Sequence, residues 1–208
     1  MKASKKANKP EDDGEWEYKE EVFATYHIEL PKKTPLMAAA LGGQLMKVKF
    51  LLLIQKKANI FQKDDHGNTA MDYAVQGGNI EIIKLFLSKG LDINGASNGG
   101  WSPLMTSVNE AYSGKVFPNG KDEVIKFLLG NGASVNYQDV KGETALMLAV
   151  ESQTDSDSDA DIIRLLIAHG ADVNLRNSEG ETALDKAIDY GNKTAADYLI
   201  ANGAKGRE

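Results

Sequence analysis

The chain has 208 residues, of which 42% are hydrophobic and 26% are charged, and this is the composition of a folded globular protein. Its net charge of −6 disfavours nucleic acids and anionic membrane surfaces as partners, and no apolar run approaches the roughly 20 residues of a membrane helix. The absence of cysteine excludes disulfides, thiolate metal sites and a cysteine nucleophile.

The first 33 residues divide into two parts. Residues 1–15 are rich in lysine, aspartate and glycine without apolar spacing, which predicts a disordered tail. Large apolar side chains follow at Trp16, Tyr18, Val22, Phe23, Tyr26, Ile28 and Leu30. We interpret 16–33 as an N-terminal cap over the domain that follows. The basic start has no apolar stretch after it, so the expected compartment is cytoplasmic, or periplasmic or exported if a signal peptide has been removed.

A short apolar pattern recurs five times after residue 33. The similar segments begin at Thr34, Thr69, Ser102, Thr144 and Thr182. Each is followed by a second segment with apolar residues at helical spacing. In the second to fifth repeats this segment ends at a glycine, namely Gly90, Gly132, Gly170 and Gly203. The pattern predicts helix pairs over 34–204, an all-α repeat solenoid, with a short tail at 205–208.

This pattern resembles the ankyrin repeat, whose signature T-P-L-H-x-A-A is followed by a second helix and G-A-D-V-N. The resemblance implies helix–turn–helix units joined by β-hairpin-like loops, in a small stand-alone protein of the bacterial type. In the family the signature histidine hydrogen-bonds between neighbouring repeats. Here its positions hold Met37, Asp72, Met105, Met147 and Asp185. We therefore expect those bonds to be rearranged or lost.

The repeat spacings of 35, 33, 42 and 38 residues locate two insertions. The extra residues lie in 109–120 and in 152–161, each in the loop between the first and second helix of a repeat. Because consecutive repeats stack nearly in register, the two enlarged loops are expected to be neighbours in space.

The second insertion raises the question of calcium. Asp155, Asp157 and Asp159 match the opening of an EF-hand loop, but Ala160 and Leu166 replace its required glycine and glutamate. We therefore expect no tight metal site, with these three aspartates as a weak candidate, and we expect Ser158 or Asp159 to cap the second helix.

The resemblance implies that hairpin tips and first-helix ends contact a partner protein. Aligning the five repeats with the family pattern gives the predicted partner-binding residues. They are Trp101, His66, Asn68, Asn98, Val140, Lys141, Glu143, Glu179, Glu181, Asn109, Glu110, Tyr112, Phe117 and Tyr190. Trp101 is the foremost candidate, because tryptophan is enriched at interface hot spots. We expect Trp101→Ala to weaken binding with little change in melting temperature. The alternative is that Trp101 only packs against the loop at 109–120.

The three histidines are scattered and no nucleophile elbow or phosphate-binding glycine loop appears, so we expect neither an enzyme nor a cofactor. The expected function is to dock a protein that has a basic surface and an apolar notch. This chain would be monomeric alone and would act as an inhibitor or immunity-type protein that covers the working surface of a partner enzyme. The alternatives are an adaptor, scaffold or secreted effector that tethers its target, and a calcium-responsive binding protein.

Overall fold

The computed structural model describes residues 33–54, 59–109, 121–151 and 157–206. These residues form ten α-helices and no β-strand. The helices are α2 (Pro35–Leu41), α3 (Leu45–Ile54), α4 (Ala70–Gln76), α5 (Ile80–Ser88), α6 (Pro103–Val108), α7 (Lys121–Gly130), α8 (Ala145–Ala149), α9 (Asp157–Ala168), α10 (Ala183–Asp189) and α11 (Lys193–Ala201). The predicted helix pairs are therefore present in all five repeats.

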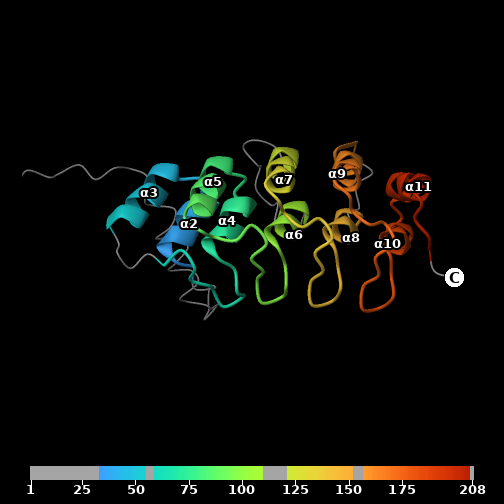
Figure 1. Cartoon of the computed structure of the whole chain (residues 1–208), viewed down its shortest axis with the longest axis horizontal. Helices are drawn as coiled ribbons and strands as arrows, with labels where there is room; N and C mark the ends of the chain where they lie inside the picture. The colour runs from blue at the N-terminus through green and yellow to red at the C-terminus, as the bar shows by residue number, and fades with distance from the viewer. Residues whose placement is uncertain (1–32, 55–58, 110–120, 152–156, 207–208) are drawn as a thin grey trace, which may run out of the picture. The chain divides into compact units, whose positions relative to one another are not determined.

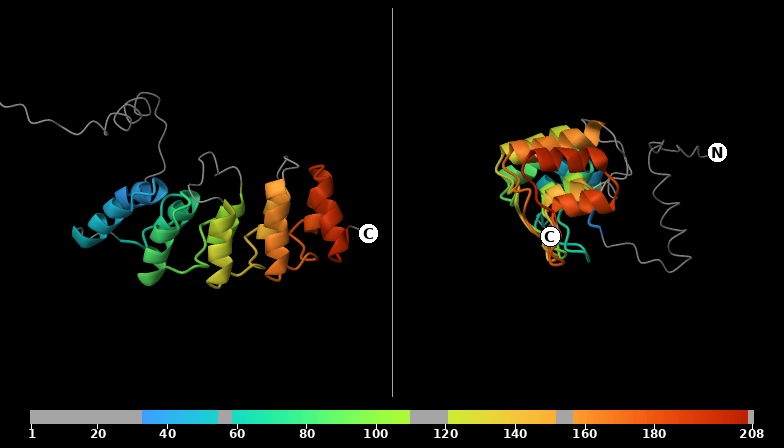
Figure 2. Two further views of the ribbon diagram at one scale, coloured as in Figure 1. Left: turned by 90° about the horizontal axis from the view of Figure 1, so that it is seen from above. Right: turned by 90° about the vertical axis from the view of Figure 1, so that its right-hand side faces the viewer.

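The helices form two layers. The first helices of the repeats, α2, α4, α6, α8 and α10, pack against one another in chain order. The second helices make the other row, in which α3 packs on α5, α7 on α9 and α9 on α11 (Figures 1 and 2). Hairpin-like loops join the repeats and project together from the edge of the first-helix row (Figure 1). The described part of the chain is thus an all-α repeat solenoid.

The first helices begin where the sequence pattern places them. Their N-caps are Thr34, Thr69, Ser102, Thr144 and Thr182. Each hydroxyl accepts a hydrogen bond from a backbone N–H of the first turn, which satisfies a donor that has no partner inside the helix. The short helices gain most of their stability from packing, because all five bury most of their residues.

The positions of the missing signature histidine take two forms. Met37, Met105 and Met147 are fully buried in the core. Asp72 and Asp185 accept a hydrogen bond from the backbone N–H of their own N-cap threonine, at 2.7 Å and 2.8 Å, and Met37 Sδ accepts the equivalent bond from Thr34 at 3.3 Å. These contacts lie within one repeat.

Asparagines link neighbouring repeats instead. The Nδ2 of Asn94 donates to the carbonyl of Gly132 at 3.3 Å, and its Oδ1 accepts from the N–H of Ser134 at 2.8 Å. Asn136 and Asn174 make the equivalent pair of bonds to the repeat that follows each of them. Each asparagine therefore satisfies both a carbonyl and an N–H of the next repeat.

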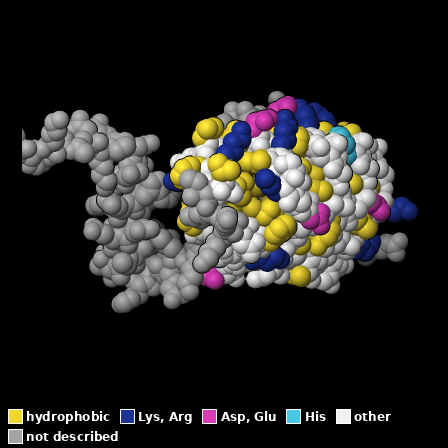
Figure 3. Space-filling model, turned by 60° about the vertical axis from the view of Figure 1, so that its left-hand side comes forward, with side chains coloured by type: hydrophobic (Ala, Val, Ile, Leu, Met, Phe, Trp, Pro, Cys, Tyr) yellow, Lys and Arg dark blue, Asp and Glu magenta, His cyan; other side chains and the backbone are white. Residues whose placement is uncertain are grey.

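Helix α3 exposes an apolar face. Met46, Phe50 and Leu53 follow one another at i, i+4 and i+7, and their exposed fractions are 76%, 58% and 82%. Hydrophobic side chains gather on the end of the stack where α3 lies (Figure 3). Residues 16–32 of the expected cap lie outside the described residues, as does the tail at 1–15.

The first expected insertion falls between the two helices of its repeat, because α6 ends at Val108 and α7 begins at Lys121. The second is only partly a loop: α8 ends at Ala149 and α9 begins at Asp157, so residues 157–161 of the expected 152–161 belong to the helix. Residues 110–120 and 152–156 lie outside the described part. The expected cap of α9 was misplaced, since Ser158 and Asp159 fall within the first helical turn. The calcium hypothesis stays a prediction, because Asp155 and the side chains of Asp157 and Asp159 are not described.

Candidate functional site

The hairpin tips are built by side chains that hold their own backbone. Asp64 Oδ1 accepts from the N–H groups of His66 and Asn68, at 2.9 Å and 2.8 Å. Asp139 and Asn177 make the same pair of bonds in the fourth and fifth repeats. Such Asx turns fix the direction of the loop without a β-strand.

Backbone bonds also join each tip to the next. The N–H of Asn98 donates to the carbonyl of His66 at 3.1 Å, and the N–H of Ser178 donates to that of Lys141 at 2.8 Å. A longer bond of 3.4 Å connects Val140 to Gly99. The four tips therefore form a continuous, mutually supported row.

Gly67, on the second tip, lies directly against Asn98 of the third tip. Its φ of 78° is in the left-handed region, and a Cβ there would overlap the backbone nitrogen and the side-chain oxygen of Asn98. We expect Gly67→Ala to cost about 2 kcal/mol or more of unfolding free energy, because it adds a steric clash to the backbone strain.

Gly180 provides the matched control for this substitution. Its φ is 79°, but no atom lies within 4 Å of a Cβ built on it. Gly180→Ala should therefore cost only about 1 kcal/mol. Equal losses for the two variants in urea unfolding would show that the tips are not in direct contact.

A hollow of about 430 Å³ lies between the second and third tips, and we call it the tip hollow. Its lining residues are Asp65, His66, Asn68, Gln76, Ser97, Asn98, Gly99, Trp101 and Thr106. Four of the predicted partner-binding residues thus meet in one place: His66, Asn68, Asn98 and Trp101. Gln76 and Thr106 extend the hollow onto α4 and α6.

Trp101 is held in place by its neighbours. Its side chain is partly buried against the core, and the indole Nε1 donates to Asp139 Oδ2 at 3.0 Å. The indole therefore has a structural role through the core and Asp139, and Trp101→Ala should lower the melting temperature, contrary to the expectation of little change. The same contacts preorganise the ring as a binding surface, which reduces the entropy lost on docking.

The other predicted residues lie outside the tip hollow. Val140, Lys141, Glu179 and Tyr190 are exposed, whereas Asn109 and Glu181 are partly buried. Glu110, Tyr112 and Phe117 fall outside the described residues, so their expected role is still a prediction. The proposed packing of Trp101 against the loop at 110–120 is likewise outside the described part.

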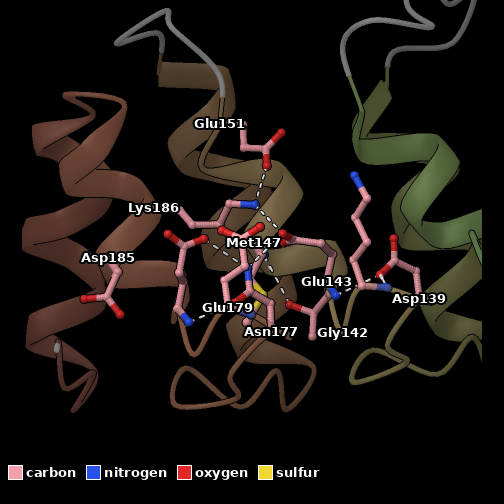
Figure 4. Close-up of polar contacts among 12 residues, drawn as sticks. Asp139, Gly142, Glu143, Met147, Glu151, Asn177, Glu179, Asp185 and Lys186 are labelled. Atoms are coloured by element: carbon pink, nitrogen blue, oxygen red, sulfur yellow. Dashed lines mark hydrogen bonds and ion pairs between the residues drawn. The ribbon is translucent and has the colours of Figure 1, made fainter.

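Glu143 is a correction to the predicted surface, because it is buried. Its Oε1 accepts from Lys186 Nζ at 2.6 Å, and the same ammonium lies 2.6 Å from Glu151 Oε1 (Figure 4). Asn177 Nδ2 also donates to Glu143 at 3.0 Å. Burial opposes the charge of Lys186, but its bonds to Glu143 and Glu151 outweigh burial and raise its pKa.

Sequence reasoning missed Lys186, although a signal existed. It occupies the fifth position of its segment, where the other repeats carry Ala38, Tyr73, Thr106 and Leu148. A charged residue at a position that faces neighbouring repeats requires a partner of opposite charge. Glu143 and Glu151 are therefore neutralised from within the stack by Lys186.

Two buried aspartates lie beneath the second tip. Burial opposes the charge of Asp64, but hydrogen bonds from Tyr73 and Asn68 prevail and hold the pKa of its carboxyl below 3.8. Asp72 behaves in the opposite way. Burial raises its pKa to about 6 against the hydrogen bonds from Thr69, and its Oδ1 has no hydrogen-bond partner among the described residues.

Across 33–54, 59–109, 121–151 and 157–206, no three His, Asp or Glu side chains gather closely enough to hold a metal ion. Within those same ranges, none of the helices has the length and apolarity that a membrane crossing requires.

Comparison with known families decides the identity of the fold. The family model of ankyrin repeats matches residues 20–97, 36–116 and 111–207. The chain belongs to the ankyrin-repeat family. Ankyrin repeats are protein–protein interaction modules, typically without catalytic activity. The first match begins at residue 20, within the segment that we expected to be a non-repeat cap.

Curated ankyrin-repeat relatives are much longer proteins. Ankyrin repeat and KH domain-containing protein mask of Drosophila melanogaster is 32% identical over 119 residues, which are 57% of this chain and 3% of that protein. Ankyrin repeat and SAM domain-containing protein 6 of Rattus norvegicus is 41% identical over 70 residues, 33% of this chain and 8% of the relative. The chain therefore spans less than a tenth of the length of either relative.

Proposed function

We propose that this ankyrin-repeat chain docks a partner protein through the tip hollow and acts without catalysis. The observation that carries the proposal is the convergence of His66, Asn68, Asn98 and Trp101 around one hollow. Its volume of about 430 Å³ is in the range of sites that bind small groups, roughly 300–1,000 Å³. A tryptophan beside such a hollow is the kind of anchor around which interface hot spots form.

The chemistry of the hollow supports a partner with a basic surface and an apolar group. Asp65 contributes a carboxylate, whereas the described lining contains neither lysine nor arginine. The indole of Trp101 adds an apolar ring. Exposed Val140 on the fourth tip and exposed Tyr190 at the C-terminal end of α10 would extend the contact along the stack.

Binding would require little rearrangement of the chain. The tips are tied together by backbone bonds, and asparagines link the repeats behind them. A preformed surface of this kind docks nearly as a rigid body. In the inhibitory version of the proposal, the partner is an enzyme whose working surface this chain covers. In the tethering version, the partner keeps its activity.

The test is affinity capture from the native source with four baits: wild type, Trp101→Ala, Asp65→Lys and Phe50→Ala. Trp101 and Asp65 come from different tips, while Phe50 is an exposed aromatic residue on the second-helix row and serves as the control. Circular dichroism first establishes that each bait is folded.

We expect wild type and Phe50→Ala to retain a protein that the two hollow variants lose. With that protein purified, Trp101→Ala should weaken binding by about 2 kcal/mol or more, roughly thirtyfold. An activity assay of the partner with and without this chain then separates inhibition from tethering. Loss of the partner in Phe50→Ala, with retention in both hollow variants, would place the site on α3 instead.

A further inference from the structure

We infer that the tip hollow receives an arginine side chain of the partner, an inference that rests on the proposed docking function.

The charge of the hollow favours a cation. Asp65 is exposed in the lining, and Asp64 and Asp139 support its two walls from behind. Hydrogen bonds from Tyr73 and Asn68 keep the Asp64 carboxyl ionised at neutral pH despite its burial. The ammonium of Lys63, on the same tip, is directed to the carbonyl of Ala96 at 3.0 Å and does not line the hollow.

The plane of Trp101 favours a flat cation. The indole is fixed at its edge by the bond from Nε1 to Asp139, so the orientation of its ring is set before a partner arrives. A guanidinium is planar and weakly hydrated, and it stacks on indole faces, whereas an ammonium is a compact and strongly hydrated point charge. The hollow therefore distinguishes arginine from lysine by geometry as well as by charge.

Side-chain amides complete the site. Asn68, Gln76 and Asn98 line the hollow from α4 and from both tips, and each carries a carbonyl oxygen that can accept a hydrogen bond. Arginine presents five N–H donors in a fixed fork, which can reach a carboxylate and more than one amide together.

Competing side chains fit less well. An aliphatic group would remove water from Asp65 and the amides without replacing their hydrogen bonds, and that loss is costly. An acidic group would meet Asp65 and the carboxylates behind it as like charges. Arginine satisfies the ring, the carboxylate and the amides at once.

The test titrates three capped tripeptides, Gly-Arg-Gly, Gly-Lys-Gly and Gly-citrulline-Gly, into the full ¹⁵N-labelled chain. The signals observed are the indole N–H of Trp101 and the side-chain amides of Gln76 and Asn98. Trp101→Phe assigns the indole signal of Trp101 against that of Trp16. Citrulline has nearly the shape of arginine without its charge, and lysine keeps the charge without the plane.

We expect the arginine peptide to shift these signals with a Kd in the millimolar range that so few contact atoms allow. The lysine peptide should bind several-fold more weakly, and citrulline should bind weakest. Asp65→Asn should weaken binding of the arginine peptide about fivefold or more, whereas Glu81→Gln, at an exposed side chain of α5, should leave it unchanged.

Three results would overturn the inference: no shift with the arginine peptide, equal shifts with citrulline, or shifts confined to residues outside the hollow. If these occur while Trp101→Ala and Asp65→Lys still lose the captured partner, the docking function stands and only the arginine assignment fails. If both hollow variants capture everything that wild type captures, the docking function itself fails.

Discussion

Lys186→Ala is expected to lower the free energy of unfolding by about 3–5 kcal/mol, the largest effect of any single substitution proposed for this chain. Lys186 is only 8% exposed, and its ammonium neutralises Glu143 and Glu151 at 2.6 Å each. Its removal leaves two carboxylates close together, one of them buried, with no counter-charge. Equilibrium unfolding in urea measures the loss.

Lys193→Ala is the matched control, since Lys193 pairs with Asp197 at 2.8 Å while their side chains are 83% and 64% exposed. That variant should change the unfolding free energy by no more than about 0.5 kcal/mol. The triple variant Glu143→Leu, Glu151→Leu, Lys186→Met should recover most of the stability, because apolar groups replace the whole cluster. A loss below about 1 kcal/mol for Lys186→Ala would show that the cluster is solvated.

Asp72→Asn is expected to stabilise the chain at neutral pH by about 1–3 kcal/mol. Burial raises the pKa of Asp72 from 3.8 to about 6, so at neutral pH the folded chain carries a buried carboxylate that it would hold better as the neutral acid. The amide is neutral at every pH and can still accept from the N–H of Thr69, as Asp72 does at 2.7 Å.

The sign of the pH dependence follows from proton binding. Between about pH 4 and pH 6 the folded state binds more protons at Asp72 than the unfolded state does, so this group makes wild type more stable as the pH falls through that window. Asp64 acts in the opposite direction and at lower pH, since its pKa is held below 3.8 and its contribution is lost as the pH falls through that lowered value.

Urea unfolding near pH 5 and near pH 7.5 tests the Asp72 prediction, and the stabilisation by Asp72→Asn should be roughly 1 kcal/mol or more greater at the higher pH. Asp185→Asn serves as the control, because Asp185 accepts from Thr182 in the same kind of capping box at 2.8 Å. Asp185→Asn measures how much an amide in place of the carboxylate changes the unfolding free energy through the capping box alone. A gain from Asp72→Asn that is the same at both pH values would contradict a raised pKa.

The repeat architecture could be predicted from the sequence because it depends on local signals. Thr34 and its four equivalents are caps, glycines such as Gly90 end the second helices, and apolar spacing sets the buried faces. These signals recur at nearly constant intervals, so each repeat corroborates the others. The cap of α9 was misplaced by a residue or more because several polar residues in succession can start a helix equally well.

The candidate site was only partly predictable, because it depends on contacts between repeats. Alignment of the repeats placed His66, Asn68, Asn98 and Trp101 at the tips. The structure brings these four residues around one hollow. Register could not show that Glu143 is drawn inward by a lysine 43 positions later in the chain. Nor could it show that Asp139 fixes the indole of Trp101, since both depend on the offset between successive tips.

Hydrogen–deuterium exchange of the chain with and without its captured partner tests the central claim most directly. The account predicts that binding slows exchange at the backbone of the second and third tips, residues 64–69 and 97–102, and leaves α5 and α9 unchanged. Protection confined to the second-helix row, with unchanged exchange at both tips, would contradict it.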